Sequence, residues 1–218
     1  MTPVVHPRLL LIALGLLLLL SIWLSLALGP VSLPLGDTLR AALRLCGLPL
    51  EGTGLERAEL IVGQIRLPRT LLGLAVGAVL ALTGVSMQGL FRNPLADPGL
   101  VGVSSGAALG AAFAIVLGAT RGDVPEAFAP YLLSASAFAG GLLVTSLVFR
   151  LGRRDGQTSV ASMLLAGVAL TALSGAVIGL LTYLADDATL RSLTFWNLGS
   201  LNGASYARLW PLLLVAGA

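Results

Sequence analysis

Residues 66–110 read RLPRTLLGLAVGAVLALTGVSMQGLFRNPLADPGLVGVSSGAALG, and they decide the fold of this chain. An apolar run of membrane-spanning length, residues 71–90, is followed by the polar break 92–98 and then by a second run rich in Gly and Ala. A hydrophobic stretch of about 20 residues is long enough to cross a bilayer as a helix. Two such runs around a short turn predict two membrane helices joined at one face of the bilayer.

The composition of the whole chain indicates the same class. Of its 218 residues, 56% are hydrophobic and only 11% are charged, and the mean hydropathy is +0.95. Soluble domains carry roughly 25% charged residues. We therefore expect an all-α polytopic membrane protein in a lipid bilayer, built as a single membrane domain over residues 1–218. The predicted spans are residues 9–28, 68–90, 98–118, 127–149 and 159–184, with a sixth from 208–218 onward.

The arginine, cysteine, histidine and lysine content argues against nucleic-acid binding, an internal disulfide, a His/Cys metal site and a Walker-type ATP site. The 13 basic residues are all arginine, and their largest cluster is Arg150, Arg153 and Arg154, so no nucleic-acid partner is expected. The single cysteine, Cys46, and the single histidine, His6, cannot form a disulfide or a His/Cys metal cluster within this chain, and no metal site is predicted. Without lysine the chain contains no G-x-x-x-x-G-K-[ST] motif, so it has no such ATP-binding site of its own.

Small residues recur every four positions along the predicted spans. This spacing lets helix backbones approach closely in lipid, where burial of apolar area gives little driving force. The predicted helix-packing residues are Gly73, Gly77 and Ala81 in the second span, Gly102, Gly106 and Gly110 in the third, and Gly167 and Gly175 in the fifth.

Three shorter features are expected outside or at the ends of the spans. Residues 37–46 carry apolar and basic side chains on different faces, which predicts an amphipathic surface helix, with an irregular loop as the alternative. Asp97 before Pro98 suits the N-cap and first position of the third span. Asp187 is predicted to cap a short helix through Trp196.

The motifs of residues 66–110 resemble those of the membrane subunit of ABC importers for iron–siderophore complexes, haem and vitamin B12. The shared patterns are R-x-P-R at 66–69, G-x-x-L-A-x-x-G-x-x-x-Q at 77–88, N-P-L-A-[DE]-P at 93–98 and G-x-x-x-G-A at 102–107. The resemblance implies a type II importer permease fold with ten helices in complete members. We therefore expect this chain, with about five and a half spans, to be truncated and to cover about the first two-thirds of such a subunit.

The resemblance also implies the function and the partners. Residues 159–170, 183–191 and 195–201 resemble the haem-importing branch most, so we expect a permease that moves haem across the bacterial inner membrane. A ferric-siderophore or cobalamin permease of the same family is the alternative. The implied partners are a second permease copy, cytoplasmic subunits that bind and hydrolyse ATP, and a periplasmic substrate-binding protein; no cofactor is expected in this chain. The resemblance places the N-terminus inside, although the loop arginines counted alone favour the opposite orientation.

Two sets of candidate site residues follow from the resemblance. Arg66 and Arg69 are expected to dock the binding protein, with anchoring at the membrane interface as the alternative. Asn93, Leu95, Ser159, Val160 and Ala161 are expected to form the cytoplasmic gate, with ordinary turn formation and helix packing as the alternative. Residues 159–161 are less polar than the hydroxyl-rich gate of the vitamin B12 importer, which suits a hydrophobic, planar ligand.

A secondary transporter or channel is the remaining rival. Proton- and sodium-coupled transporters use carboxylates within the membrane, whereas every acidic residue here falls in a predicted loop or at a span end. Met87, Met163 and Tyr183 are conceivable ligands of haem iron, but such side chains in helices more often serve packing.

Overall fold

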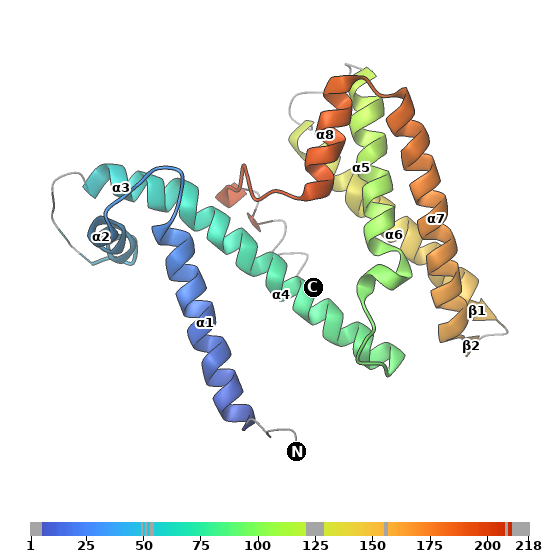
Figure 1. Ribbon diagram of the computed structural model, residues 1–218, viewed down its shortest axis with the longest axis horizontal. Helices are drawn as coiled ribbons and strands as arrows, with labels where there is room; N and C mark the ends of the chain where they lie inside the picture. The colour runs from blue at the N-terminus through green and yellow to red at the C-terminus, as the bar shows by residue number, and fades with distance from the viewer. Residues whose placement is uncertain are drawn as a thin grey trace. The chain divides into compact units, whose positions relative to one another are not determined.

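The structure is a computed structural model that describes residues 6–48, 50, 52, 55–120, 129–154, 157–207 and 209–210. These residues are almost entirely helical, which confirms the all-α prediction (Figure 1). They belong to two compact units, residues 1–79 with 201–218 and residues 80–200. Within the described residues, the helices Pro7–Ala27, Leu55–Phe91, Tyr131–Gly152 and Val160–Leu184 are long and apolar enough to span a membrane, and Val103–Gly118 is a shorter apolar helix.

The first unit is organised around the C-terminal end of its first helix. Its elements are α1 (Pro7–Ala27), α2 (Leu35–Leu45), α3 (Leu55–Ile61), the π-helix η1 (Val62–Arg66) and the first half of α4 (Leu67–Phe91). Leu26, Ala41, Ala58 and Val62 form its buried core, where the end of α1 meets α2, α3 and η1. The leucines of α1 from Leu9 to Leu20 are at least half exposed, as expected of a helix that faces lipid.

The predicted amphipathic helix is present as α2. Thr38 and Ala41 are fully buried on one face, while Arg40 and Arg44 are exposed on the other. Arg40 pairs with Asp37 one turn earlier at 3.5 Å. The helix is therefore held by the face that carries Thr38 and Ala41, since exposed ion pairs contribute little. The face expected to be apolar is the wrong one, because Leu39 and Cys46 are exposed.

The second predicted span begins earlier than expected. It was predicted to start at Pro68, but α3, η1 and α4 form one continuous helix of 37 residues from Leu55 to Phe91. Proline usually ends or kinks a helix because it has no N–H to donate and its ring clashes with the preceding turn. Here Pro68 lies buried within the helix, directly after the π-helical turn.

The π-helical turn explains how the helix passes through the proline. The Leu67 N–H donates to the Val62 carbonyl, five residues back instead of four. With the same five-residue spacing, the Gly63 carbonyl would accept a hydrogen bond from the N–H of residue 68. Pro68 has no N–H, so this bond cannot form. The Tyr206 hydroxyl donates to this carbonyl at 2.7 Å. A side chain from a distant part of the sequence thus satisfies the acceptor that the proline leaves open.

The second unit contains the rest of α4 and a compact group of helices. Its elements are the 3-10 helix η2 (Pro98–Val101), α5 (Val103–Thr120), α6 (Ala129–Gly152), the two-residue strands β1 (Arg153–Arg154) and β2 (Gln157–Thr158), α7 (Val160–Leu184) and α8 (Asp187–Leu198). The strands pair antiparallel, Arg153 with Thr158, and connect α6 to α7 (Figure 1). One buried cluster joins α5, α7 and α8, and another joins η2, α6 and α7.

The third predicted span is not one continuous helix from residue 98. Asp97 caps its start as expected, accepting a hydrogen bond from the Gly99 N–H at 2.7 Å, but only the single turn η2 follows. Gly102 then takes the left-handed conformation, with φ of 79°, and α5 begins at Val103. A Cβ at Gly102 would also lie 2.8 Å from Cγ1 of Val144. Glycine permits both the backbone break and the close approach of α6.

Helices α5 and α6 meet backbone to backbone at glycines. A Cβ at Gly106 would lie 2.5 Å from the carbonyl oxygen of Gly140, and a Cβ at Gly110 would lie 2.0 Å from that of Ser136. No side chain larger than hydrogen fits at these positions without separating the helices. In lipid this closeness stabilises the pair through van der Waals contact.

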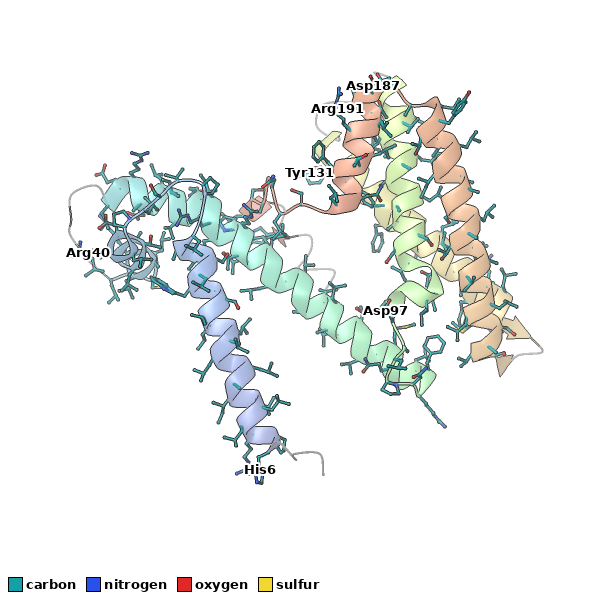
Figure 2. All side chains as sticks on the ribbon, in the orientation of Figure 1. His6, Arg40, Asp97, Tyr131, Asp187 and Arg191 are labelled. Carbon is teal, nitrogen blue, oxygen red and sulfur yellow. The ribbon has the colours of Figure 1, made fainter. Side chains whose placement is uncertain are left out.

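The last helix of the second unit is capped one residue earlier than predicted. Asp186, not Asp187, is the N-cap of α8, because its carboxylate accepts a hydrogen bond from the Thr189 N–H at 2.9 Å. Asp187 is the first helical residue and lies exposed on α8 with Arg191 (Figure 2). Of two adjacent aspartates, only the one whose backbone is extended can turn its side chain back to the helix N–H groups.

We predict that Gly110→Ala destabilises the protein. The added methyl group meets the Ser136 carbonyl, so the free energy of unfolding should fall by about 1–3 kcal/mol. Gly118→Ala on the same helix is the matched control, because a Cβ there meets none of the described residues within 4 Å. Denaturation of the purified protein in detergent measures both variants. Equal effects of the two would contradict the packing described for α5 and α6.

We also predict that the α8 cap is lost in acid. Hydrogen bonds from the Thr189 hydroxyl and N–H hold the pKa of Asp186 below its ordinary value. A lowered folded-state pKa means that the stabilisation is present above the unfolded-state pKa of about 3.9 and is lost as the pH falls through the folded-state pKa. Amide protection factors of α8 should therefore decrease below about pH 4. Asp186→Asn should keep the cap without this pH dependence, and Asp186→Ala should lower protection at every pH.

Candidate functional site

The first candidate residue, Arg66, points inward. Its side chain is only 6% exposed, and its guanidinium donates hydrogen bonds to the carbonyls of Leu26 at 2.6 Å and Ala27 at 2.8 Å, and also to that of Val31. These acceptors belong to the last turn of α1 and to the connection that follows it. The guanidinium of Arg66 therefore binds backbone carbonyls of its own chain.

The end of α1 explains why an arginine is held there. The last carbonyls of a helix have no partner within the helix and carry its partial negative charge. The last turn of α1 contains no basic residue that could satisfy them. Arg66, at the end of the π-helix η1, supplies the missing donors. Gly29 leaves space for the guanidinium, because a Cβ at Gly29 would lie 3.0 Å from it.

Thr70 directly follows the R-x-P-R motif and is buried on the same side of the helix as Arg66. Its hydroxyl donates to the Arg66 carbonyl at 2.9 Å and lies 2.7 Å from the hydroxyl of Ser25 on α1. Arg69, the second candidate docking residue, is exposed. Arg66 and Thr70 thus face α1, whereas Arg69 between them lies at the surface, a division that spacing along the sequence did not indicate.

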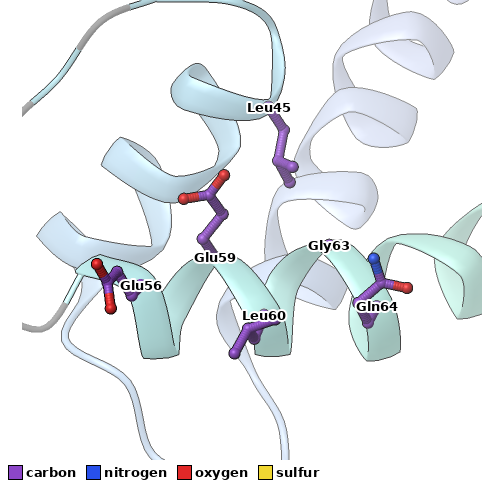
Figure 3. Close-up of a pocket in the computed structure, with 6 residues that line it drawn as sticks. All are labelled: Leu45, Glu56, Glu59, Leu60, Gly63 and Gln64. Atoms are coloured by element: carbon purple, nitrogen blue, oxygen red, sulfur yellow. The ribbon is translucent and has the colours of Figure 1, made fainter.

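A surface hollow of about 340 Å³ lies next to this motif within the first unit. It is lined by Leu45 of α2, by Glu56, Glu59 and Leu60 of α3, and by Gly63 and Gln64 of the π-helix (Figure 3). Glu59 pairs with Arg44 of α2 at 3.3 Å. No local sequence pattern indicates this hollow, because it depends on the distance between α2 and the π-helix.

The first part of the candidate gate is the turn after α4. Arg92 adopts a left-handed conformation with φ of 49°, which ends the helix. The Asn93 Oδ1 accepts a hydrogen bond from the Leu95 N–H at 2.9 Å, so the asparagine shapes its own turn. Leu95 is 84% exposed at the tip. A large apolar side chain in this position is available for contact with another surface.

The second part of the candidate gate is the start of α7. Ser159 is the N-cap, with its Oγ accepting a hydrogen bond from the Ser162 N–H at 3.3 Å, and Val160 and Ala161 are exposed. Phe91 at the end of α4 packs against the cluster that contains Met163 of α7. The two parts of the candidate gate therefore lie at one end of the second unit, although the hydrogen bonds of Asn93 and Ser159 stay within their own turns.

The predicted packing residues lie in different surroundings. Contacts at Gly102, Gly106 and Gly110 are close, as described above, and a Cβ at Gly167 would lie 2.1 Å from the Leu100 carbonyl oxygen. At Gly73 a Cβ would make an ordinary contact with Leu201, whereas at Gly77 and Gly175 it would meet none of the described residues within 4 Å. Ala81 is exposed.

The conceivable iron ligands are not brought together. Met163 is buried in the cluster of the second unit and Met87 packs against it, whereas Tyr183 is 85% exposed. Within the residues that the structure describes, no group of three or more His, Cys, Asp or Glu side chains could hold a metal ion. The two methionines serve packing, as their apolar surroundings indicate.

Four long apolar helices and lipid-compatible glycine packing define a multi-pass membrane protein. The chain belongs to the FecCD transport family, whose pattern it matches over residues 17–218. This membership confirms the family resemblance of residues 66–110.

Two curated relatives are similar over nearly the whole chain. It is 43% identical over 215 residues to the hemin transport system permease protein HmuU of Yersinia pestis, an alignment that covers 98% of this chain and 58% of HmuU. It is 40% identical over 203 residues to the vitamin B12 import system permease protein BtuC of Shigella boydii, covering 93% of this chain and 55% of BtuC. The chain thus spans somewhat more than half the length of these relatives.

A solved structure supports the fold. A protein described as a metal-chelate type ABC transporter, in an inward-facing conformation, matches with a TM-score of 0.72 and 33% sequence identity. The match covers 96% of this chain and 60% of that chain. The predicted permease fold is therefore confirmed for the part that this chain contains.

Proposed function

We propose that this chain is part of the permease subunit of an ATP-driven importer that moves haem across the bacterial inner membrane. The observation that carries the proposal is the 43% identity to a hemin permease across 98% of the chain. The exposed, apolar Val160 and Ala161 at the start of α7 are compatible with a hydrophobic, planar substrate. Cobalamin is the second candidate, because the identity to vitamin B12 permeases is nearly as high.

The proposed subunit works with partners and has no enzymatic activity of its own. Without lysine the chain lacks a phosphate-binding loop of the G-x-x-x-x-G-K-[ST] type, so ATP is bound and hydrolysed by a cytoplasmic subunit. A second permease copy completes the path, and a periplasmic binding protein delivers the substrate. No cofactor is held by this chain; haem is its cargo.

Of the two candidate docking residues, Arg69 is the one proposed to meet the binding protein directly. A partner that approaches the outer surface reaches Arg69 without rearrangement, because its side chain is exposed. It reaches Arg66 only after the bonds to three carbonyls have been broken. An exposed arginine can pair with a carboxylate of the partner and accelerate encounter.

We predict that Arg69→Glu weakens docking of the binding protein. Reversal of the charge replaces attraction by repulsion, and the apparent affinity should fall by about tenfold or more. The measurement is stimulation of ATP hydrolysis in liposomes that contain the complete permease and its ATPase, titrated with hemin-loaded binding protein. Arg57→Glu is the control, since Arg57 is also an exposed arginine of the first unit, on α3.

The outcomes separate the substrate from the docking role. If Arg69→Glu and Arg57→Glu lower the apparent affinity for the binding protein equally, general surface charge, and not Arg69, guides docking. If the binding protein stimulates the wild type when loaded with cobalamin or a ferric siderophore but not with hemin, the haem assignment is wrong. Substrate movement without nucleotide would instead favour a secondary transporter or channel.

The inner gate is proposed to close by contact between two copies of the turn after α4. Leu95 is the most exposed apolar residue of this turn, and its backbone is held by Asn93. An apolar side chain at the axis of a dimer can block water and ions and still withdraw to release a bulky substrate.

We predict that Leu95→Cys forms a disulfide between two permease copies when the gate is closed. The Cα atoms must then lie within about 7 Å of each other. The native Cys46 is exposed and should first be replaced by serine. Leu151→Cys is the control, since Leu151 is 62% exposed near the end of α6. Oxidation followed by non-reducing electrophoresis measures the bond, and crosslinking of Leu151→Cys alone would contradict the proposed gate.

A further inference from the structure

We propose that Arg92 and Arg153 bind carboxylates of the cargo as it leaves the inner gate, so that this exit favours a substrate with an apolar ring and anionic side groups. This inference rests on the proposed function and names the residues that would recognise the charge of the cargo. It concerns one end of the second unit, where the turn after α4 and the connection between α6 and α7 carry the two parts of the candidate gate.

Arg92 lies directly beside the first part of the candidate gate. It ends α4 with a φ of 49° and immediately precedes Asn93, whose side chain shapes the turn that exposes Leu95. Phe91, the residue before it, packs against the buried cluster that joins η2, α6 and α7, so the end of α4 is fixed to these elements. Arg92 itself is exposed. Its guanidinium is therefore accessible from the same turn that presents Leu95.

Arg153 lies beside the second part of the candidate gate. It is the first residue of β1 and pairs with Thr158 of β2, the residue before Ser159 (Figure 1). The Ser159 N–H donates to the Gly152 carbonyl at 2.9 Å, which fixes the end of α6 to the start of α7. Arg153 is exposed, as are Thr158 and Val160. Each part of the candidate gate therefore adjoins one exposed arginine.

Positive charge prevails in these two segments. The sequence places four arginines but only two aspartates within residues 92–98 and 150–158. Among the residues that the structure describes, neither Arg92 nor Arg153 forms an ion pair, and the carboxylate of Asp97 accepts a hydrogen bond from the Gly99 N–H. The two guanidinium groups are thus available to an anionic ligand. A planar guanidinium can bind a carboxylate through two parallel hydrogen bonds.

Exposed apolar side chains adjoin both arginines. Leu95 is 84% exposed in the turn of Arg92, and Val160 is 41% exposed at the start of α7. A planar macrocycle such as hemin combines an apolar ring with two propionate carboxylates, which lose hydration when the ring contacts apolar side chains. Guanidinium groups beside those contacts replace the lost water with charge-assisted hydrogen bonds. Because the arginines are exposed, the interaction stays weak enough for the cargo to leave.

The same arrangement distinguishes the two candidate substrates by charge. The ring side chains of hemin end in carboxylates at two positions, whereas those of the cobalamin ring end in amides. A hydrogen bond from a guanidinium to a carboxylate is roughly twice as strong as one between neutral groups. The two arginines therefore favour hemin.

Arg150 provides a matched control at the same end of the second unit. Val148 is buried in the cluster that contains Met163, and a Cβ at Gly152 would also meet Met163. Arg150 lies two residues from each of them on α6, roughly half a turn around the helix, so it faces away from α7. It is exposed as well. Its replacement removes the same charge from the same end without changing either part of the gate.

The test uses the complete permease with its ATPase in phosphatidylcholine nanodiscs, as wild type, Arg92→Gln, Arg153→Gln, the double variant and Arg150→Gln. Binding of hemin and of hemin dimethyl ester, whose carboxylates are neutralised, is measured by haem absorbance relative to empty nanodiscs. The double variant should bind hemin about tenfold more weakly and the ester as tightly as the wild type does. Each single variant should show part of this loss, and Arg150→Gln should stay within about twofold of the wild type.

Several results would overturn the proposal. If the double variant loses affinity for hemin and for its ester equally, the arginines shape the gate and do not bind carboxylates. If Arg150→Gln loses as much affinity as the double variant, general positive charge at this end attracts hemin. If the double variant differs from the wild type only in nanodiscs that contain anionic phosphatidylglycerol, the two arginines bind lipid headgroups. A wild type that does not bind hemin would also contradict the proposal.

The proposed function is measured separately in the same nanodiscs, as stimulation of ATP hydrolysis by the hemin-loaded binding protein. If only a cobalamin-loaded binding protein stimulates the wild type, the proposed haem function fails. The comparison of hemin with its ester then still decides whether Arg92 and Arg153 bind carboxylates.

Discussion

The carbonyl groups at the C-terminal end of α1 need hydrogen-bond donors, and the arrangement of the first unit depends on how these donors are supplied. The helix has no basic residue in its last turn, so Arg66 donates from a position about 40 residues further along the chain. This contact lies beside the small core formed by Leu26, Ala41, Ala58 and Val62. Backbone groups that are shielded from water and left without a partner are costly, and one buried arginine satisfies several of them here.

A backbone carbonyl also needs a donor from elsewhere within the long helix Leu55–Phe91. Pro68 has no N–H, and the π-helical turn before it leaves the Gly63 carbonyl for Tyr206 to satisfy. Both solutions bring a side chain from a distant segment to a free carbonyl. The R-x-P-R motif therefore combines a helix irregularity, an inward-facing cation and an outward-facing cation within four residues, which a simple pair of interface anchors would not require.

The second unit depends instead on closeness of backbones. Gly106 and Gly110 face α6 so tightly that a methyl group cannot be accommodated, and Gly102 breaks the helix where α5 begins. Apolar side chains alone would not hold these helices together in lipid, because the surrounding lipid chains are equally apolar. The packed helices carry at one end the turn with Leu95 and the start of α7, which together form the proposed gate.

Sequence alone determined the helical class, most spans, the cap at Asp97 and the membership of a transport family, since apolar length, glycine spacing and motif order are local properties. Tertiary structure alone decided which arginine faces inward, where the second span begins, which of two aspartates caps α8 and which glycines touch another helix. Arg66 and Arg69 are the same residue type three positions apart, and only the position of the end of α1 makes one buried and the other exposed. These outcomes depend on free carbonyls and backbone distances between segments far apart in the chain, which no local pattern records.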